Sequence, residues 1–261
     1  MSQRRIDAIR PLPKLRSEII TAAESLSLRY VQELGDWALL GISFDRFYES
    51  VIYPDYGIVL EEDCDLGFDA DGSKILGQFE PASNTVYIDA SLNRSLQDPR
   101  RTFTLYHEVA GHGVLQGEWL RAEFGRISKS GKLTTTEAML DLKTVNVLER
   151  QANLFAAHVA APRWLLKHAM GAKLKLCCPV AFLGRGQYCV DVGRRTSFYF
   201  ADTFDDVCRR LALTIQPYFG GLSIEALSYR IAEAGWAVDV SASRFRLHRA
   251  ERRAPEFSGC P

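Results

Sequence analysis

The stretch Thr104-Leu-Tyr-His-Glu-Val-Ala-Gly-His-Gly-Val-Leu-Gln-Gly117 carries two histidines and a glutamate on one apolar segment. A helix that holds a catalytic zinc ion normally spaces its histidines four residues apart, with a glutamate directly after the first. In this chain His107 and His112 are five residues apart. Because five residues carry a regular helix about 140° past a full turn, a regular helix would point the two imidazoles apart.

Three arrangements of this segment agree with its sequence. In the first, a wide turn closed by hydrogen bonds from residue i to i+5, a π-bulge, returns both imidazoles to one face. Gly111 lies inside that turn and lowers the energetic cost of the distortion, because it has no Cβ atom. In the second, Glu108 and His112, four residues apart, are the metal ligands and His107 is not. In the third, no metal binds, and the histidines are ordinary polar residues of a half-buried helix.

The flanking residues predict one helix over residues 99–116. Asp98 can serve as the N-cap, Pro99 suits the first helical position, and Gly117 supplies a stop. Apolar side chains recur at intervals of three and four residues, which indicates one buried face. These are Phe103, Tyr106, Ala110, Gly113 and Val114.

A third metal ligand is expected from a second helix, at residues 148–162. Glu149 and Asn153 are one turn apart and share a face with the small residues Ala156 and Ala160, so this face can approach the first helix closely. His158 follows Glu149 by nine residues, about 180° around the helix, so the two cannot face one ion. We therefore prefer Glu149 as the ligand; the alternative is a solvated glutamate on an amphipathic helix.

Three segments in this order resemble the ImmA/IrrE metallopeptidase family. They are Arg101-Thr-Phe-Thr-Leu-Tyr-His-Glu-Val-Ala-Gly-His112, then Glu149-Arg-Gln-Ala-Asn-Leu-Phe-Ala-Ala157 with Pro162, and Leu222-Ser-Ile-Glu-Ala-Leu-Ser-Tyr-Arg-Ile-Ala-Glu-Ala-Gly235. The resemblance covers roughly residues 15–240 and implies a cytoplasmic, gluzincin-like zinc endopeptidase that often cleaves a helix-turn-helix transcriptional repressor. It makes His107, His112 and Glu149 the metal ligands and Glu108 the catalytic general base. Zn²⁺ is the expected metal, with Mn²⁺ as the alternative.

The chain departs from the family pattern in two places. The family usually spaces its histidines by four residues, and the segment from 170 to 202 is longer than the family needs. Within that segment, short β-like runs at residues 188–192 and 197–200 indicate an inserted hairpin. Its cysteines, Cys177, Cys178 and Cys189, show no Cys-x-x-Cys spacing, so we expect free thiols rather than a second metal site.

The sequence favours an α+β fold with a small antiparallel sheet, followed by a zinc-hydrolase helix pair and C-terminal helices. Strand-like runs at residues 57–61, 74–79 and 85–90 are separated by turn residues typical of an antiparallel meander. We expect one metallopeptidase-like domain over residues 1–261. It comprises a core at 15–170, the insert at 170–202, C-terminal helices at 203–240 and a basic tail at 241–261.

Composition limits the partners of the protein. The 261 residues are 47% hydrophobic and 25% charged, which suits a full core and excludes a disordered regulator. With 32 basic and 32 acidic residues, no large electrostatic footprint for nucleic acid is present. Residues 1–10 lack the apolar run of a signal peptide, and no stretch approaches a membrane span, so we expect a cytoplasmic location.

Two functions from different classes remain. The first is peptide hydrolysis, in which Glu108 takes a proton from water and returns it to the leaving nitrogen. The alternative is a catalytically inactive, protease-derived module that sequesters a regulator, suggested by the displaced His112. The sequence assigns no donor for the oxyanion; the candidates are Tyr106, His158, His168, Tyr188 and Tyr199.

Overall fold

The computed structural model describes residues 14–69, 71–93, 99–128, 142–184, 186–192 and 195–241. The α+β class expected from the sequence is confirmed. The chain forms two compact units: unit 1 comprises Met1–Pro162 and Phe219–Leu222, and unit 2 comprises Arg163–Tyr218 and Ser223–Pro261. The expectation of a single domain stays a prediction.

The first helix of unit 1, α1 (Arg16–Leu34), is amphipathic. Its buried face includes Ile19, Ala23, Leu26 and Tyr30. A series of short helical segments follows, consisting of η1 (Gly35–Leu40), α2 (Phe44–Phe47), the π-helical η2 (Tyr48–Ile52) and α3 (Tyr53–Tyr56). Phe47, Val51 and Ile52 of this series are fully buried and extend the core formed by α1.

The sheet of unit 1 is mixed, so the predicted antiparallel meander is wrong. Its strands are β1 (Val59–Cys64), β2 (Gly77–Glu80) and β3 (Thr85–Asp89), in the order β1-β3-β2. β2 and β3 form the expected antiparallel pair, but β1 pairs parallel with β3. The reason is burial: β3 is the most apolar strand, is mostly buried on both faces, and therefore takes the centre. Residues 65–84 are long enough to return the chain for a parallel pairing.

The helix that carries the two histidines changes its geometry twice. It starts at Pro99 as α4 (Pro99–Leu105), continues as the π-helix η4 (Tyr106–Gln116) and runs on as α5 (Gly117–Ser128). The expected N-cap, Asp98, lies outside the described residues. Gly117 does not end the helix, because its φ of −58° and ψ of −43° are helical. Its missing side chain instead admits Phe79 of β2, whose ring would lie 3.3 Å from an added Cβ.

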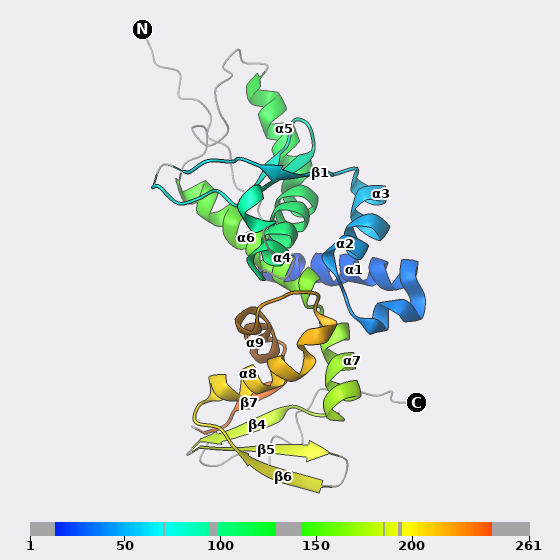
Figure 1. Ribbon diagram of the computed structural model, residues 1–261, viewed down its shortest axis with the longest axis vertical. Helices are drawn as coiled ribbons and strands as arrows, with labels where there is room; N and C mark the ends of the chain where they lie inside the picture. The colour runs from blue at the N-terminus through cyan, green and yellow to red at the C-terminus, as the bar shows by residue number, and fades with distance from the viewer. Residues whose placement is uncertain are drawn as a thin grey trace. The chain divides into compact units, whose positions relative to one another are not determined.

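The second predicted helix is α6 (Leu142–Ala160), which packs against η4 and α1 and lies beside α4 (Figure 1). Leu148, Ala152, Phe155 and Val159 recur on one face of α6 and are all buried. η4 is thus held between α6 on one side and the strand β2 on another.

Unit 2 combines helices with a four-stranded sheet. Its elements are α7 (Arg163–Leu174), β4 (Val180–Gly184), β5 (Gln187–Val192), β6 (Arg195–Phe200), α8 (Phe204–Ile215), η6 (Gln216–Tyr218), α9 (Ile224–Glu233) and β7 (Ala237–Asp239). The predicted hairpin is confirmed as the antiparallel pair of β5 and β6, and the strand order is β6-β5-β4-β7. Figure 1 shows α8 beside β7 and β4, with β5 and β6 farther out. No helix among the described residues has the length and apolar character needed to cross a membrane.

Candidate metal centre

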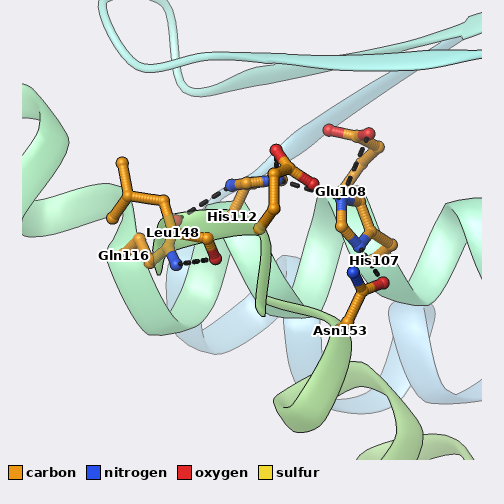
Figure 2. Close-up of polar contacts among 7 residues, drawn as sticks. His107, Glu108, His112, Gln116, Leu148 and Asn153 are labelled. Carbon is orange, nitrogen blue, oxygen red and sulfur yellow. Dashed lines mark hydrogen bonds and ion pairs between the residues drawn. The ribbon is translucent and has the colours of Figure 1, made fainter. Parts of the chain in front are cut away.

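His107 and His112 face each other, because the chain between them is a π-helix (Figure 2). Their ring centroids lie 4.7 Å apart, and the two Nε2 atoms are separated by 3.0 Å. A turn closed from residue i to i+5 brings side chains five positions apart to one face. The wide turn of the first arrangement is therefore confirmed, and it extends over the whole of Tyr106–Gln116 rather than one turn.

Glycine permits the close packing that surrounds this wide turn. A Cβ atom added to Gly111 would lie 2.8 Å from Cβ of Ala152 and 2.9 Å from its carbonyl oxygen, so η4 and α6 touch almost backbone to backbone. On another face of η4, a Cβ at Gly113 would lie 2.7 Å from Cδ1 of Ile58. The small residues bring α6, and the polar side chains on it, within reach of the two imidazoles.

Glu149 of α6 approaches both histidines. Its Oε2 lies 3.1 Å from Nε2 of His107, and its Oε1 lies 3.2 Å from Nε2 of His112. Donor atoms about 2.1 Å from one tetrahedral ion lie about 3.4 Å from one another. The observed separations of 3.0, 3.1 and 3.2 Å fall only slightly below that value. These three side chains consequently fit the donor set of a tetrahedral metal ion.

The outer nitrogen of each imidazole faces an amide oxygen. Nδ1 of His107 is 3.1 Å from Oδ1 of Asn153, and Nδ1 of His112 is 2.9 Å from Oε1 of Gln116 (Figure 2). Gln116 is oriented by its own Nε2, which donates to the carbonyl oxygen of Leu148 at 2.8 Å. Because an amide oxygen can only accept, each Nδ1 is a donor, so either ring in its neutral form carries its lone pair on Nε2.

These contacts point the two Nε2 atoms at each other across 3.0 Å, so either a proton or a metal ion must lie between them. The pKa shifts in the pocket also indicate that it stabilises positive charge. Burial alone would lower the pKa of His112, but the hydrogen bond to Glu149 and the charge of Glu108 raise it to about 9. Burial would raise the pKa of Glu149, but the two histidines hold it well below the usual range of a glutamate. The pocket thus stabilises positive charge, whether a proton or a metal ion carries it.

Glu108 lies beside the group formed by His107, His112 and Glu149. Its Oε1 is 3.9 Å from Nε2 of His107, a longer distance than either contact of Glu149. Burial raises the pKa of Glu108, although His112, His107 and a hydrogen bond with the backbone of Phe79 act in the opposite direction. The residue is 8% exposed and packs against β2, where a Cβ at Gly77 would lie 2.6 Å from its Cγ.

The positions of the two carboxylates divide their roles. The described part of the chain holds one group of at least three His, Cys, Asp or Glu residues with ligand atoms within 4.8 Å of one another, namely His107, Glu108 and His112. Glu149 also contacts both imidazoles directly and is the more exposed carboxylate, with 45% of its side chain accessible against 11% for Glu108. Glu149 therefore suits the third ligand position, which leaves Glu108 free to exchange a proton.

Two of the five candidate oxyanion donors point elsewhere. Tyr106 is 2% exposed, and its ring packs edge-on against Phe44 at 5.2 Å. His158 is fully buried, and its Nδ1 lies 3.5 Å from Oε1 of Glu24 on α1. The remaining candidates, His168, Tyr188 and Tyr199, belong to unit 2.

Five of the six cysteines lie among the described residues. Cys64, Cys177, Cys178, Cys189 and Cys208 are free thiols, whereas Cys260 lies outside the described residues. Cys177, Cys178 and Cys189 do not form a group with mutual distances that suit a metal ion among the described residues.

Sequence reasoning missed two residues of the site. Gln116 follows His112 by four residues, a spacing at which helical side chains commonly interact, so its role could have been proposed. Gly77 comes from a strand whose position beside Glu108 depends on tertiary structure, and no local signal indicates it.

No family model matches this chain, and no curated protein matches it. The resemblance to the ImmA/IrrE family therefore stays a prediction from sequence motifs.

Proposed function

We propose that the protein is a zinc-dependent peptidase with His107, His112 and Glu149 as metal ligands and Glu108 as the general base. The observation that carries the proposal is the convergence of both Nε2 atoms and the Glu149 carboxylate within 3.2 Å of one another. Asn153 and Gln116 support it, because they bind the outer nitrogens as partners of metal-bound histidines usually do. The proposal extends to Mn²⁺ as an alternative metal.

The chain's own residues supply the proton transfers of hydrolysis. A zinc ion held by two imidazoles and a carboxylate lowers the pKa of water toward about 7 and polarises a carbonyl group. Glu108 takes the proton of the attacking water and afterwards delivers it to the leaving nitrogen. Its position supports this role, since it is close to His107, buried, and held in place by Gly77 and the backbone of Phe79.

An extended polypeptide suits the surroundings of Glu108. β2 is an edge strand within the described sheet, because its only partner there is β3. Gly77 and Phe79 of this strand contact or hydrogen-bond Glu108, so main-chain pairing along β2 would bring a peptide bond to the general base. A helix-turn-helix repressor as the physiological substrate rests on the family resemblance alone.

The alternative, a binding module without catalysis, was motivated by the additional residue between the histidines. The π-helix compensates for that residue and returns His112 to the site. No contact of the described residues favours the inactive module over the peptidase.

The metal content and the role of Glu108 can be tested together. Purified protein is dialysed against zinc, its metal is counted by mass spectrometry, and new N-termini are mapped in a complex peptide library. We expect about one zinc per chain and cleavage in the wild type. Glu108→Gln should retain zinc and lose cleavage, whereas Glu149→Ala should lose both. The matched control is Glu118→Gln, which alters an exposed glutamate of α5 and should leave both properties unchanged.

Either of two results would overturn the proposal. Wild-type protein that binds no zinc would contradict the proposed metal site. Equal numbers of new termini from the wild type and Glu108→Gln, including none from either, would contradict the proposed peptidase activity. In the second case, retained zinc would show that the metal site itself is correct.

A further inference from the structure

The strand β6 of unit 2 exposes an unusual row of aromatic side chains. Phe198 is 64% exposed, Tyr199 is 49% exposed and Phe200 is 75% exposed. Large apolar side chains are normally buried, and an exposed apolar strand at the edge of a sheet readily pairs with another chain. Within the described residues, β6 has a single neighbouring strand, β5, so one of its edges is open there.

The hydrogen bonds of the β5–β6 pair show which backbone groups the open edge presents. The amide of Ala201 donates to the carbonyl oxygen of Gly186 at 3.0 Å, across the pair. Backbone groups alternate in direction along a strand, and Tyr199 pairs with Tyr188 in register with this contact. The amides and carbonyls of Thr196, Phe198 and Phe200 therefore point away from β5. The partner for this edge must be an extended strand.

The side chains of β6 also alternate between the two faces of the sheet. Tyr199 stacks on Tyr188, with ring centroids 5.4 Å apart, on the same face as Phe182. Phe182 in turn contacts Phe204 of α8, so this is the helix-covered face. Phe198 and Phe200 lie on the opposite face, next to Cys189 and Gln187 in the register of the pair. A second strand at the edge would cover both phenylalanines from the side.

We propose that this edge pairs with β6 of a second copy of the chain, in an antiparallel arrangement centred on Tyr199. Such pairing places Phe198 of each copy opposite Phe200 of the other, which forms two aromatic cross-strand pairs on one face. The twofold axis is perpendicular to the sheet, so both copies present the same face. The two four-stranded sheets then become one continuous sheet of eight strands.

Charge favours this antiparallel arrangement over a parallel one. β6 begins at Arg195, and Asp202 follows its last residue by two positions; both residues are exposed. Antiparallel pairing places the end of each strand that carries Arg195 beside the end of the other strand that carries Asp202, whereas parallel pairing would place like charges at the same end. The strand is consequently complementary to itself in backbone, aromatic side chains and charge, and a second copy is the occupant that this chemistry fits.

The oligomeric state of the full chain tests the proposal. Sedimentation equilibrium and light scattering should give a molar mass approaching twice that of one chain as the concentration rises from about 1 to about 100 µM. Phe198→Lys places a charge in the interface and should weaken dimerisation at least tenfold, which corresponds to about 1.4 kcal/mol. The matched control is Tyr229→Lys on α9, which replaces a 78% exposed aromatic outside the edge and should still dimerise. Circular dichroism should confirm that both variants are folded.

A cysteine at the centre of the pair tests the register independently of stability. Tyr199 of one copy would lie opposite Tyr199 of the other at a Cα separation of about 4.5 to 5.5 Å, which a disulfide can bridge. Mild oxidation of Tyr199→Cys should therefore yield a covalent dimer, whereas Tyr229→Cys should not. A chain that stays monomeric to about 100 µM, or a dimer unaffected by Phe198→Lys and not linked through Tyr199→Cys, would overturn the proposal. Neither result depends on bound metal or on peptidase activity.

Discussion

Nε2 of His107 lies 3.0 Å from Nε2 of His112, although five residues of sequence carry the chain from one to the other. A regular α-helix would direct these side chains apart, so this contact is a direct product of the π-helix Tyr106–Gln116. The same wide turns bring Glu149 within hydrogen-bond distance of both rings. The conformation of the backbone therefore sets the geometry of the proposed metal site, and substitutions that alter the first should alter the second.

Substitution of Asn153 should tune zinc affinity in both directions. Asn153→Leu removes the acceptor for Nδ1 of His107, so we expect zinc binding to weaken by about 10-fold to 100-fold. Asn153→Asp places a carboxylate there and should strengthen binding, because a charged acceptor makes the imidazole a better ligand. Competition with a chelator of known affinity measures both effects. Arg150→Ala, at an exposed position of the same helix, should bind zinc as the wild type does. Equal affinities for all four proteins would contradict the role of Asn153.

Gly111→Ala should separate η4 from α6. Its Cβ would lie within 2.9 Å of backbone atoms of Ala152, which cannot move without moving the helix that carries Glu149. We expect a loss of about 1–3 kcal/mol in the free energy of unfolding and weaker zinc binding. Urea denaturation and a chelator competition would measure the two effects. Gly171→Ala is the control, since its Cβ would approach nothing closer than 4.0 Å. Unchanged zinc affinity in Gly111→Ala would show that this close approach is unimportant.

Gly77→Ala should impair catalysis while leaving the metal in place. The added methyl group would meet Cγ of Glu108 at 2.6 Å and Cγ2 of Thr104 at 2.7 Å, so the carboxylate must shift. A displacement of about 1 Å can reduce the rate about 100-fold, and we expect a decrease in kcat of this order. Zinc counted by mass spectrometry should stay near one per chain, in contrast to Gly111→Ala. Loss of zinc from Gly77→Ala would show that Glu108 is needed as a ligand, which contradicts the assignment of its role.

Stability at low pH should depend on Asp89. This carboxylate is 1% exposed; it accepts hydrogen bonds from the amides of Leu66 and Ser91 and pairs with Lys74 at 2.9 Å. Burial would raise the pKa of Asp89, but these contacts hold it well below its usual range. In the unfolded chain the pKa of this carboxyl is about 3.9, so the unfolded state binds the proton more tightly than the folded state does. The stabilisation is therefore complete above about pH 5 and is lost as the pH falls below about 4.

Replacement of Asp89 should remove part of that pH dependence. Asp89→Asn is expected to lower the free energy of unfolding at pH 7 by about 1–3 kcal/mol, and the difference from the wild type should shrink toward pH 2. Chemical denaturation at several pH values gives both quantities. Asp36→Asn, at an exposed position of η1, should follow the wild-type curve. A difference that stays constant between pH 7 and pH 2 would contradict the ionised state of Asp89 as the source of the stabilisation.

The sequence by itself determined the features that depend on local periodicity and residue chemistry. The helix α6, the α+β class and the β5–β6 hairpin all follow from residue spacing and local residue chemistry. The five-residue spacing of the histidines also predicts a wide turn, because a buried segment with two imidazoles and a carboxylate needs them on one face. The candidate residues His107, Glu108, His112 and Glu149 were available at this level.

Only the tertiary structure decided which distant segments meet. The parallel pairing of β1 with β3 reflects competition for the buried centre of the sheet, which turn residues do not reveal. Gly117 has the chemistry of a helix stop, yet its backbone is helical, and Phe79 packs 3.3 Å from where its Cβ would lie. The contacts of Gln116 with Leu148 and of Gly77 with Glu108 likewise join separate elements. Local sequence sets the conformations that a segment can adopt, but the burial of apolar surface and the pairing of polar groups over the whole chain select among them.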